Sequence, residues 1–286
     1  VSNAQWYERG KTVLPGGVCS STRLNQGIGS PVYVARADGA RFTDVDGREY
    51  IDMSCGHGAA LLGHNHPAIH EALIQAAELG ICCAADMPYH IQLAEMLCEM
   101  IPCAEKIRFT NSGSEANDTI IRMVRHFWAL EGKPQKQTII GRTYGYHGST
   151  IMSASMGGMT AMHEQAATAP DFAHIKPPYG FLYQGNLSTA DFAALAASWL
   201  EDKINEIGAD QIAAFIAEPI QGAGGVILPP EGYLNHVEAI CRKYDILFIV
   251  DEVITGFGRT GQWFASQTFG LSPDMMTLAK GLTSGY

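Results

Sequence analysis

A carboxylate and an amine each follow an apolar run near the end of the chain. The run Ile246–Val250 contains five apolar residues, mostly β-branched or aromatic, and leads directly into Asp251. Met275–Ala279 leads into Lys280 in the same manner. Such runs are typical of strands that are buried on both faces of a parallel sheet. Because open α/β sheets bind ligands at the carboxyl ends of their strands, the acid and the amine suggest a site.

Two interpretations of this pair remain open from the residues alone. An Asp after a strand is most often a turn or helix-capping residue, and a Lys near an apolar run usually lies in solvent. The chemical alternative is a Schiff-base lysine with an acid that pairs with a pyridinium nitrogen, the two protein groups that pyridoxal phosphate chemistry requires. That alternative also needs a phosphate cradle and a platform for the ring elsewhere in the chain.

Three other stretches offer such parts. Ser112 and Glu115 have the spacing of a capping box, and a helix N-terminus can bind phosphate through its exposed N–H groups. Tyr146 lies between glycines after a predicted strand, where an aromatic ring can lie flat against a planar ligand. Glu218 follows the apolar run 212–217. For all these residues, separate structural explanations would have to coincide on one edge of the sheet, which favours a site.

The elements that must position these residues alternate between strand and helix. The predicted strands are 106–110, 138–140, 212–217, 246–250 and 275–279, and the predicted helices are 67–79, 93–101, 113–131, 191–207 and 233–244. This alternation predicts an α/β fold with a mostly parallel sheet and helices on both faces. We expect residues 170–186 to form a long aromatic loop.

The start of the chain has a different character. Asp38-Gly39 and Asp46-Gly47 are turn signals between short strand-like runs, which indicates antiparallel hairpins. We therefore expect an N-terminal segment, residues 1–62, ahead of a large α/β domain, residues 63–286.

Composition narrows the class of protein. Of the 286 residues 47% are hydrophobic and 17% are charged, as in a globular enzyme, and the net charge of −10 argues against nucleic acid or an anionic membrane as a partner. There is no long apolar span and no signal peptide, so we expect a cytoplasmic protein. The seven cysteines are then expected to be reduced, with a regulatory disulfide between Cys82 and Cys83 as the alternative.

Three histidines offer a competing hypothesis of metal binding. His66 and His70 would share one face of a helix, and His64 lies nearby. A structural or catalytic metal needs three or four ligands, and no Cys, Asp or Glu completes a recognisable set here. We expect no metal.

The chain resembles the class III, or ω-type, pyridoxal phosphate-dependent aminotransferases, which have the aspartate-aminotransferase-like fold (fold type I). The resemblance covers nearly the whole chain, and its most specific motifs are Thr110–Asn117, Tyr146–Gly148, Glu218–Gly222, Asp251–Val253 and Gly256–Gly261. In this family a small C-terminal domain follows the lysine, and we expect that domain to be absent from this chain.

The resemblance implies how the cofactor would be held. Ser112, Gly113 and Ser114 would bind its phosphate. Tyr146 would stack on one face of its ring, and Val253 would pack on the other.

The resemblance also implies the chemical roles. Asp251 would pair with the pyridine nitrogen and keep it protonated, with His147 beside the ring and Glu218 close by. Lys280 would form the Schiff base and then act as general base and acid.

The implied activity is transfer of an amino group from an ω-amino acid or amine to a keto acid such as pyruvate, by a ping-pong Schiff-base mechanism. Ornithine- and γ-aminobutyrate-type members usually carry Glu where this chain has Ala223, which favours the amine:pyruvate type. The start Pro15–Val18 is more similar to glutamate-1-semialdehyde aminomutases, so an isomerase of the same fold is the alternative. The family also implies a homodimer with its active site at the subunit interface.

Overall fold

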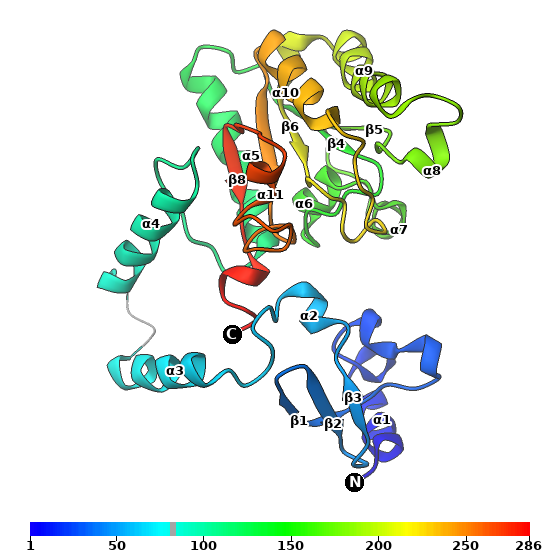
Figure 1. Ribbon diagram of the computed structural model, residues 1–286, viewed down its shortest axis with the longest axis vertical. Coiled ribbons are helices and arrows are strands. Elements are labelled where there is room, and N and C mark those ends of the chain that lie inside the picture. The colour runs from blue at the N-terminus through cyan, green and yellow to red at the C-terminus, as the bar shows by residue number, and fades with distance from the viewer. Residues whose placement is uncertain (81–83) are drawn as a thin grey trace. The chain divides into compact units, whose positions relative to one another are not determined.

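The computed structural model describes residues 1–80 and 84–286, and the chain divides into two compact units (Figure 1). The N-terminal unit comprises Val1–Ala85 with Thr283–Tyr286, and the α/β unit comprises Asp86–Leu282. The expected division after residue 62 stays a prediction. Cys82 and Cys83 lie outside the described residues, so their expected state stays a prediction as well.

The N-terminal unit contains the expected hairpins. Its sheet has the antiparallel order β1-β2-β3, and the strands are β1 (Val34–Asp38), β2 (Arg41–Asp44) and β3 (Glu49–Ile51). Asp44, the last residue of β2, is buried, and its carboxylate accepts hydrogen bonds from the backbone N–H groups of Asp46 and Arg48 and from the hydroxyl of Tyr50. This buried acid fixes the turn between β2 and β3.

The remaining elements of this unit are helical. They are α1 (Asn3–Lys11), η1 (Pro15–Gly17), η2 (Ser21–Leu24), η3 (Gln26–Ile28), α2 (Cys55–Gly58) and α3 (Pro67–Leu79). The helix α3 begins with Pro67 and ends before Gly80, which has a φ of 76°, as the sequence predicts.

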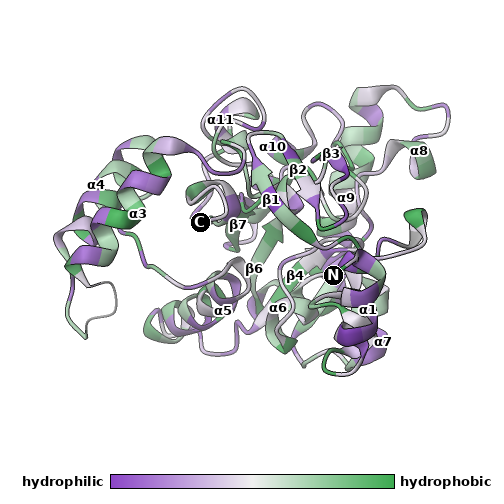
Figure 2. Cartoon of the chain, turned by 90° about the horizontal axis from the view of Figure 1, so that it is seen from below, coloured by the Kyte–Doolittle hydropathy of each residue, from purple (hydrophilic) through white to green (hydrophobic). Residues whose placement is uncertain are grey.

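The helix α1 was not predicted from the sequence. Ser2 and Gln5 form a capping box, in which each side chain accepts the other residue's backbone N–H. The helix buries no side chain, and most of it is hydrophilic in Figure 2. A search for apolar periodicity therefore misses this helix, although the spacing of Ser2 and Gln5 is that of a capping box.

The α/β unit is built on a five-stranded parallel sheet of order β5-β4-β6-β7-β8. The strands are β4 (Thr138–Arg142), β5 (Phe172–Ile175), β6 (Ile212–Ala217), β7 (Leu247–Asp251) and β8 (Met275–Thr277). All six residues of β6 are buried, as expected for a central strand with both faces covered. In the ladder between β7 and β8, Asp251 pairs with Thr277.

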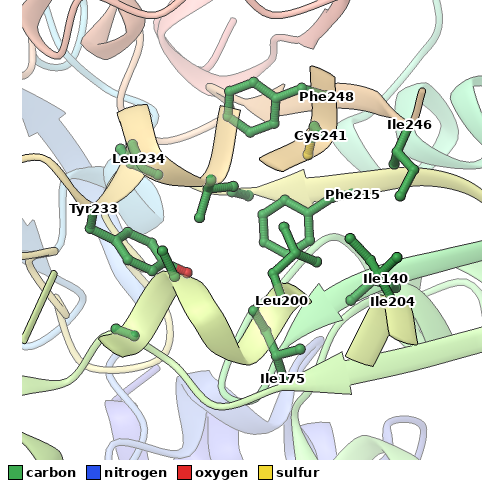
Figure 3. Close-up of a cluster of buried hydrophobic side chains, with 14 of the residues drawn as sticks. Ile140, Ile175, Leu200, Ile204, Phe215, Tyr233, Leu234, Cys241, Ile246 and Phe248 are labelled. Carbon is green, nitrogen blue, oxygen red and sulfur yellow. The ribbon is translucent and has the colours of Figure 1, made fainter. Parts of the chain in front are cut away.

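Helices cover both faces of this sheet. The helices α9 and α10 pack on one face and α5 and α6 on the other. The described helices of this unit are α4 (Pro88–Met100), α5 (Gly113–Leu130), α6 (Ile151–Met156), α7 (Thr160–Gln165), α8 (Gly180–Tyr183), α9 (Thr189–Ile207), α10 (Tyr233–Lys243) and α11 (Ala265–Thr268), with η4 (Ala209–Gln211) and η5 (Lys280–Leu282). Alternate residues of β6 enter different cores. Phe215 packs with α9 and α10 (Figure 3), whereas Ile216 packs with α5. The prediction of an α/β fold is confirmed.

Two segments differ from the expectation. Residues 106–110 form no strand, because none of the described strands pairs with them and a ladder needs a partner. The expected loop 170–186 instead contains β5 and α8. The strand was missed because it is short and its sequence lies among Pro, Gly and Tyr residues.

Candidate active site

The parallel sheet brings the predicted residues to one edge, because all its strands end on the same side. Asp251 is the last residue of β7, and Glu218 directly follows β6. Tyr146 and His147 lie in the loop after β4, and Lys280 begins η5 just beyond β8. The topology that was expected from the β-α alternation is thus the one that gathers these side chains.

A cavity of about 130 Å³ lies at this edge, and its walls are Gly113, Ser114, Asn117, Tyr146, His147, Gly148, Glu218, Asp251, Val253, Ile254, Ala279 and Lys280. Every predicted site residue except Ser112 is among them. A larger cavity of about 530 Å³ lies elsewhere in this unit, between residues 97–123 and 274–282, and most of its walls are apolar. The smaller cavity is the candidate site because acids and an amine converge there.

The first turn of α5 forms one wall. Ser112 caps the helix, since its Oγ accepts the backbone N–H of Glu115 at 3.2 Å. The expected capping box is not formed, because the carboxylate of Glu115 accepts the N–H of Asn111 at 2.8 Å rather than that of Ser112. The first N–H groups of a helix lack intrahelical acceptors, so Gly113 and Ser114 present anion-binding groups to the cavity.

The loop after β4 packs directly on this turn. Gly148 has a φ of 143°, and a Cβ there would lie 2.7 Å from the Oγ and 2.8 Å from the Cα of Ser114. Only glycine permits this approach. On the other side, a Cβ on Gly113 would lie 3.2 Å from a methyl group of Val253. The three segments around the cavity are therefore in close contact.

Asp251 is fully buried, and its carboxylate accepts several hydrogen bonds. Its Oδ2 accepts from Nδ1 of His147 at 2.7 Å and from Nδ2 of Asn117 at 3.0 Å, and its Oδ1 accepts the N–H of Val253 at 3.0 Å. Burial by itself would raise the pKa of this carboxyl. The hydrogen bond and charge of His147, with the other two donors, outweigh burial and lower the pKa of Asp251 below its ordinary value. The site thus keeps a buried anion.

Glu218 is also buried but is held differently. Its carboxylate accepts the backbone N–H groups of Tyr146 and Gly222, each at 3.0 Å, and its own carbonyl oxygen accepts a hydrogen bond from Arg142. Burial, with the like charge of Asp251, raises the pKa of Glu218 above its ordinary value. Its contacts position the loop that carries Tyr146.

Lys280 combines a strained backbone with a perturbed amine. Its φ is 43°, in the left-handed region that a lysine seldom adopts, and such strain concentrates at functional sites. Burial lowers the pKa of Lys280 and Arg259 adds to this effect, while Asp251 and Glu218 oppose it. The neutral, nucleophilic amine is therefore easier to reach than in a solvent-exposed lysine.

Asn117 is a site residue to which no role was assigned from the sequence. It lies within the quoted motif and is buried against Asp251. A signal existed, since Asn117 precedes Ile120, Ile121 and Val124 by three, four and seven residues and so shares the apolar face of α5. An amide on an otherwise apolar helix face implies a buried polar partner.

The competing histidine hypothesis gains no geometric support. In the N-terminal unit, Nε2 of His64 lies 2.7 Å from a carboxylate oxygen of Asp52. Among residues 1–80 and 84–286, no group of three His, Cys, Asp or Glu side chains is arranged to hold a metal ion. The same described part of the chain holds no helix with the length and apolarity needed to span a membrane.

Comparison with known proteins assigns this fold and site to a class. Residues 25–286 match the family model described as aminotransferase class-III. The chain belongs to the class-III aminotransferase family, and the resemblance noted from its motifs is confirmed. Its sheet and helices are those of this family's fold.

Two individual relatives show which members of the family the chain is similar to. The chain is 46% identical over 266 residues to a putrescine–pyruvate aminotransferase of Pseudomonas aeruginosa, covering 88% of this chain and 57% of that protein. It is 38% identical over 271 residues to the mitochondrial γ-aminobutyrate transaminase 1 of Oryza sativa subsp. indica, covering 90% of this chain and 51% of that protein. The chain thus spans about half the length of these relatives.

Solved structures agree with the assignment. An (S)-enantioselective omega-transaminase from Thermomicrobium roseum superposes with a TM-score of 0.91 at 36% identity, covering 100% of this chain and 64% of that chain. An omega transaminase from Pseudomonas jessenii, solved in complex with PMP, gives a TM-score of 0.91 at 40% identity and covers 98% and 63%. These relatives are named as transaminases, which does not favour the aminomutase alternative.

Proposed function

We propose that the whole protein is a pyridoxal phosphate-dependent aminotransferase that moves an amino group from an amine or ω-amino acid to a keto acid such as pyruvate. One observation carries the proposal. A buried acid with a lowered pKa, Asp251, and a partly buried amine with a lowered pKa, Lys280, line one cavity beside the start of a long helix. These are the groups that the cofactor's ring nitrogen, aldehyde and phosphate require.

The residues present fit pyridoxal phosphate. The first turn of α5, at Gly113 and Ser114, offers N–H and hydroxyl groups for the phosphate. Tyr146 and Val253 line the cavity and would contact the faces of the ring. Asp251 is an anion without a lysine or arginine partner among its described contacts, which suits a protonated ring nitrogen. Ser112 caps α5 with its hydroxyl and directly precedes Gly113, so it would help to form the phosphate site.

Each residue then has a defined task in the mechanism. When bound, pyridoxal phosphate supplies a sink for the electron pair left when a proton leaves the amine carbon of the substrate. Asp251 holds the proton on the ring nitrogen, and His147 holds Asp251 in place. The Nζ of Lys280 takes the proton from the substrate carbon and returns one, because its lowered pKa makes the neutral base accessible. Glu218 fixes the backbone at Tyr146 and so positions the loop beside the cavity.

The substrate class follows the relatives that the chain is similar to. A putrescine–pyruvate aminotransferase is 46% identical to this chain, which supports an amine donor and pyruvate as acceptor. Ala223, in place of the Glu usual in γ-aminobutyrate-type members, supports the same choice. We further propose a cytoplasmic homodimer with its active site at the subunit interface. The exposed apolar side chains of α4, such as Tyr89, Ile91 and Met96, support burial of that helix in an assembly.

A half-reaction tests the proposal. Full-length protein loaded with pyridoxal phosphate is mixed with putrescine or γ-aminobutyrate, and the visible absorbance of the cofactor is followed before and after addition of pyruvate. We expect the amine to remove the absorbance and pyruvate to restore it with formation of alanine. Turnover of a single substrate without any keto acid would instead indicate an isomerase.

The lysine assignment has a matched control. Lys280→Ala should lose the lysine-dependent visible band and all turnover, because no other amine lines the cavity walls named above. Lys243→Ala removes an exposed lysine that pairs with Glu201 and should keep both. Retention of the band in Lys280→Ala would contradict the assignment.

A further inference from the structure

Both N–H groups of the Asn117 side-chain amide donate hydrogen bonds within the site. It lies in α5, one turn after Gly113, and is 1% exposed. Its Nδ2 donates to the carbonyl oxygen of His147 at 2.7 Å and to Oδ2 of Asp251 at 3.0 Å. Because the amide nitrogen carries two hydrogens, both are used. One side chain thus connects α5, the loop after β4 and the end of β7.

The orientation of this amide is determined by its neighbours. A flipped amide would direct Oδ1 at a carbonyl oxygen and a carboxylate oxygen, which offer no hydrogen to accept. The observed orientation leaves Oδ1 of Asn117 buried and without a hydrogen-bond partner among the described residues. A buried unpaired acceptor carries a free-energy cost, so the donor role is retained against that cost.

The donors also constrain the carboxylate of Asp251. Two side-chain donors, from His147 and Asn117, converge on Oδ2, while Oδ1 accepts the N–H of Val253. Rotation of the carboxylate would break contacts with all three residues. Since Asn117 is on the helix whose first turn lines the cavity, the acid has a fixed position relative to Gly113 and Ser114.

We propose that Asn117 is a positioning residue, which holds the carboxylate of Asp251 at a set place relative to the anion-binding turn of α5 so that it meets the cofactor's ring nitrogen. This inference rests on the proposed function, because it assigns Asn117 a task toward the same cofactor. Asn117 acts through Asp251, so its effect depends on the ring nitrogen and not on the phosphate.

Binding measurements with two ligands test this dependence. The ligands are pyridoxal phosphate and its 1-deaza analogue, in which a C–H group replaces the ring nitrogen, and the apoprotein's Kd for each is measured by equilibrium dialysis. In Asn117→Leu, which keeps the branched shape and the number of heavy atoms but removes both donors, we expect the Kd for pyridoxal phosphate to rise about tenfold, as for loss of a hydrogen bond to a charged group. The Kd for the deaza analogue should stay within about twofold of the wild-type value.

A second variant and a control keep the result interpretable. Asn117→Ala cannot clash with its neighbours and should show the same selective loss, so it carries the test if Asn117→Leu does not fold. Arg122→Gln changes the exposed face of α5 and should leave both Kd values unchanged. Thermal unfolding of each apoprotein verifies that the variants are folded.

The outcomes separate this inference from the proposed function. An equal rise in Kd for both ligands would mean that Asn117 only supports the fold. No rise for either ligand would mean that the position of Asp251 does not depend on Asn117. Each result overturns the inference while wild-type binding of pyridoxal phosphate upholds the function. If the wild-type protein binds neither ligand, both the function and the inference fail.

Discussion

The ends of β6 and β7 each carry a buried carboxylate, and the surroundings of the two shift their pKa values in opposite directions. Glu218 accepts backbone N–H groups and lies near the charge of Asp251, so burial raises its pKa. Asp251 is at least as buried, yet donors from His147 and Asn117 lower its pKa. Neighbouring strands of one sheet thus carry acids whose pKa values are shifted in opposite directions, because burial alone does not fix the pKa of a carboxyl.

The largest effect should come from removing the charge on β7. In the full-length protein, Asp251→Asn should lower kcat/KM by about 10²- to 10³-fold, the range seen when one preorganised electrostatic group is lost from a site. Steady-state kinetics with an amine and pyruvate measure this loss. A reduction smaller than that caused by Glu218→Gln would invert the assignment of the two acids.

A smaller effect on activity should follow from the same change on β6. Glu218→Gln keeps the size of the side chain and one backbone contact, so we expect kcat/KM to fall by less than about tenfold. The matched comparison is Asp251→Asn under the same assay. An equal loss in the two variants would show that both carboxylates act directly on the reaction.

The hydrogen bond between His147 and Asp251 should make the stability of the protein depend on pH. This hydrogen bond lowers the folded-state pKa of Asp251 below the ordinary 3.8, so this stabilisation is present above pH 3.8 and is lost as pH falls through the folded pKa. We expect His147→Leu to lower the free energy of unfolding of the apoprotein by about 2 kcal/mol at pH 7. Urea unfolding at several pH values measures this. A deficit that does not shrink at low pH would assign it to packing instead.

Glu218 should show the opposite dependence on pH, with the smallest magnitude. Its folded-state pKa is raised above the ordinary 4.5, so ionisation costs stability as pH rises through and above 4.5. Relative to wild type, Glu218→Gln should therefore gain free energy of unfolding between pH 4.5 and pH 8. The same unfolding series detects this, and a constant difference between variant and wild type would contradict it.

The sequence predicts the sheet more completely than the contacts around it. The strands at 212–217 and 246–250 are long apolar runs, which admit few other interpretations in a β-α alternation. Their parallel order then places Glu218 and Asp251 on one edge. The segment 106–110, in which polar and apolar residues alternate, was also predicted as a strand but forms none, since a strand depends on a hydrogen-bonding neighbour that its own residues do not encode.

The site residues were predicted from sequence motifs, but the contacts between them were not, because these contacts join residues that are distant in sequence. Residue types identified Lys280 and Asp251, and the cavity contains both. The contact between Asn117 and Asp251 spans 134 residues of sequence, so local spacing does not reveal it. The hydrogen bond that the carboxylate of Glu115 accepts from the N–H of Asn111, rather than from that of Ser112, likewise depends on the conformation of the chain before α5.

The pairing of Asp251 with Thr277 sets a limit on how this protein can diversify. Side chains along a strand alternate between faces, so a slip of one residue between β7 and β8 would turn the acid to the opposite face of the sheet. Insertions or deletions within these two short strands would therefore displace the carboxylate of Asp251 from the cavity in a single step, whereas a change in the length of the loops that follow would leave this register intact.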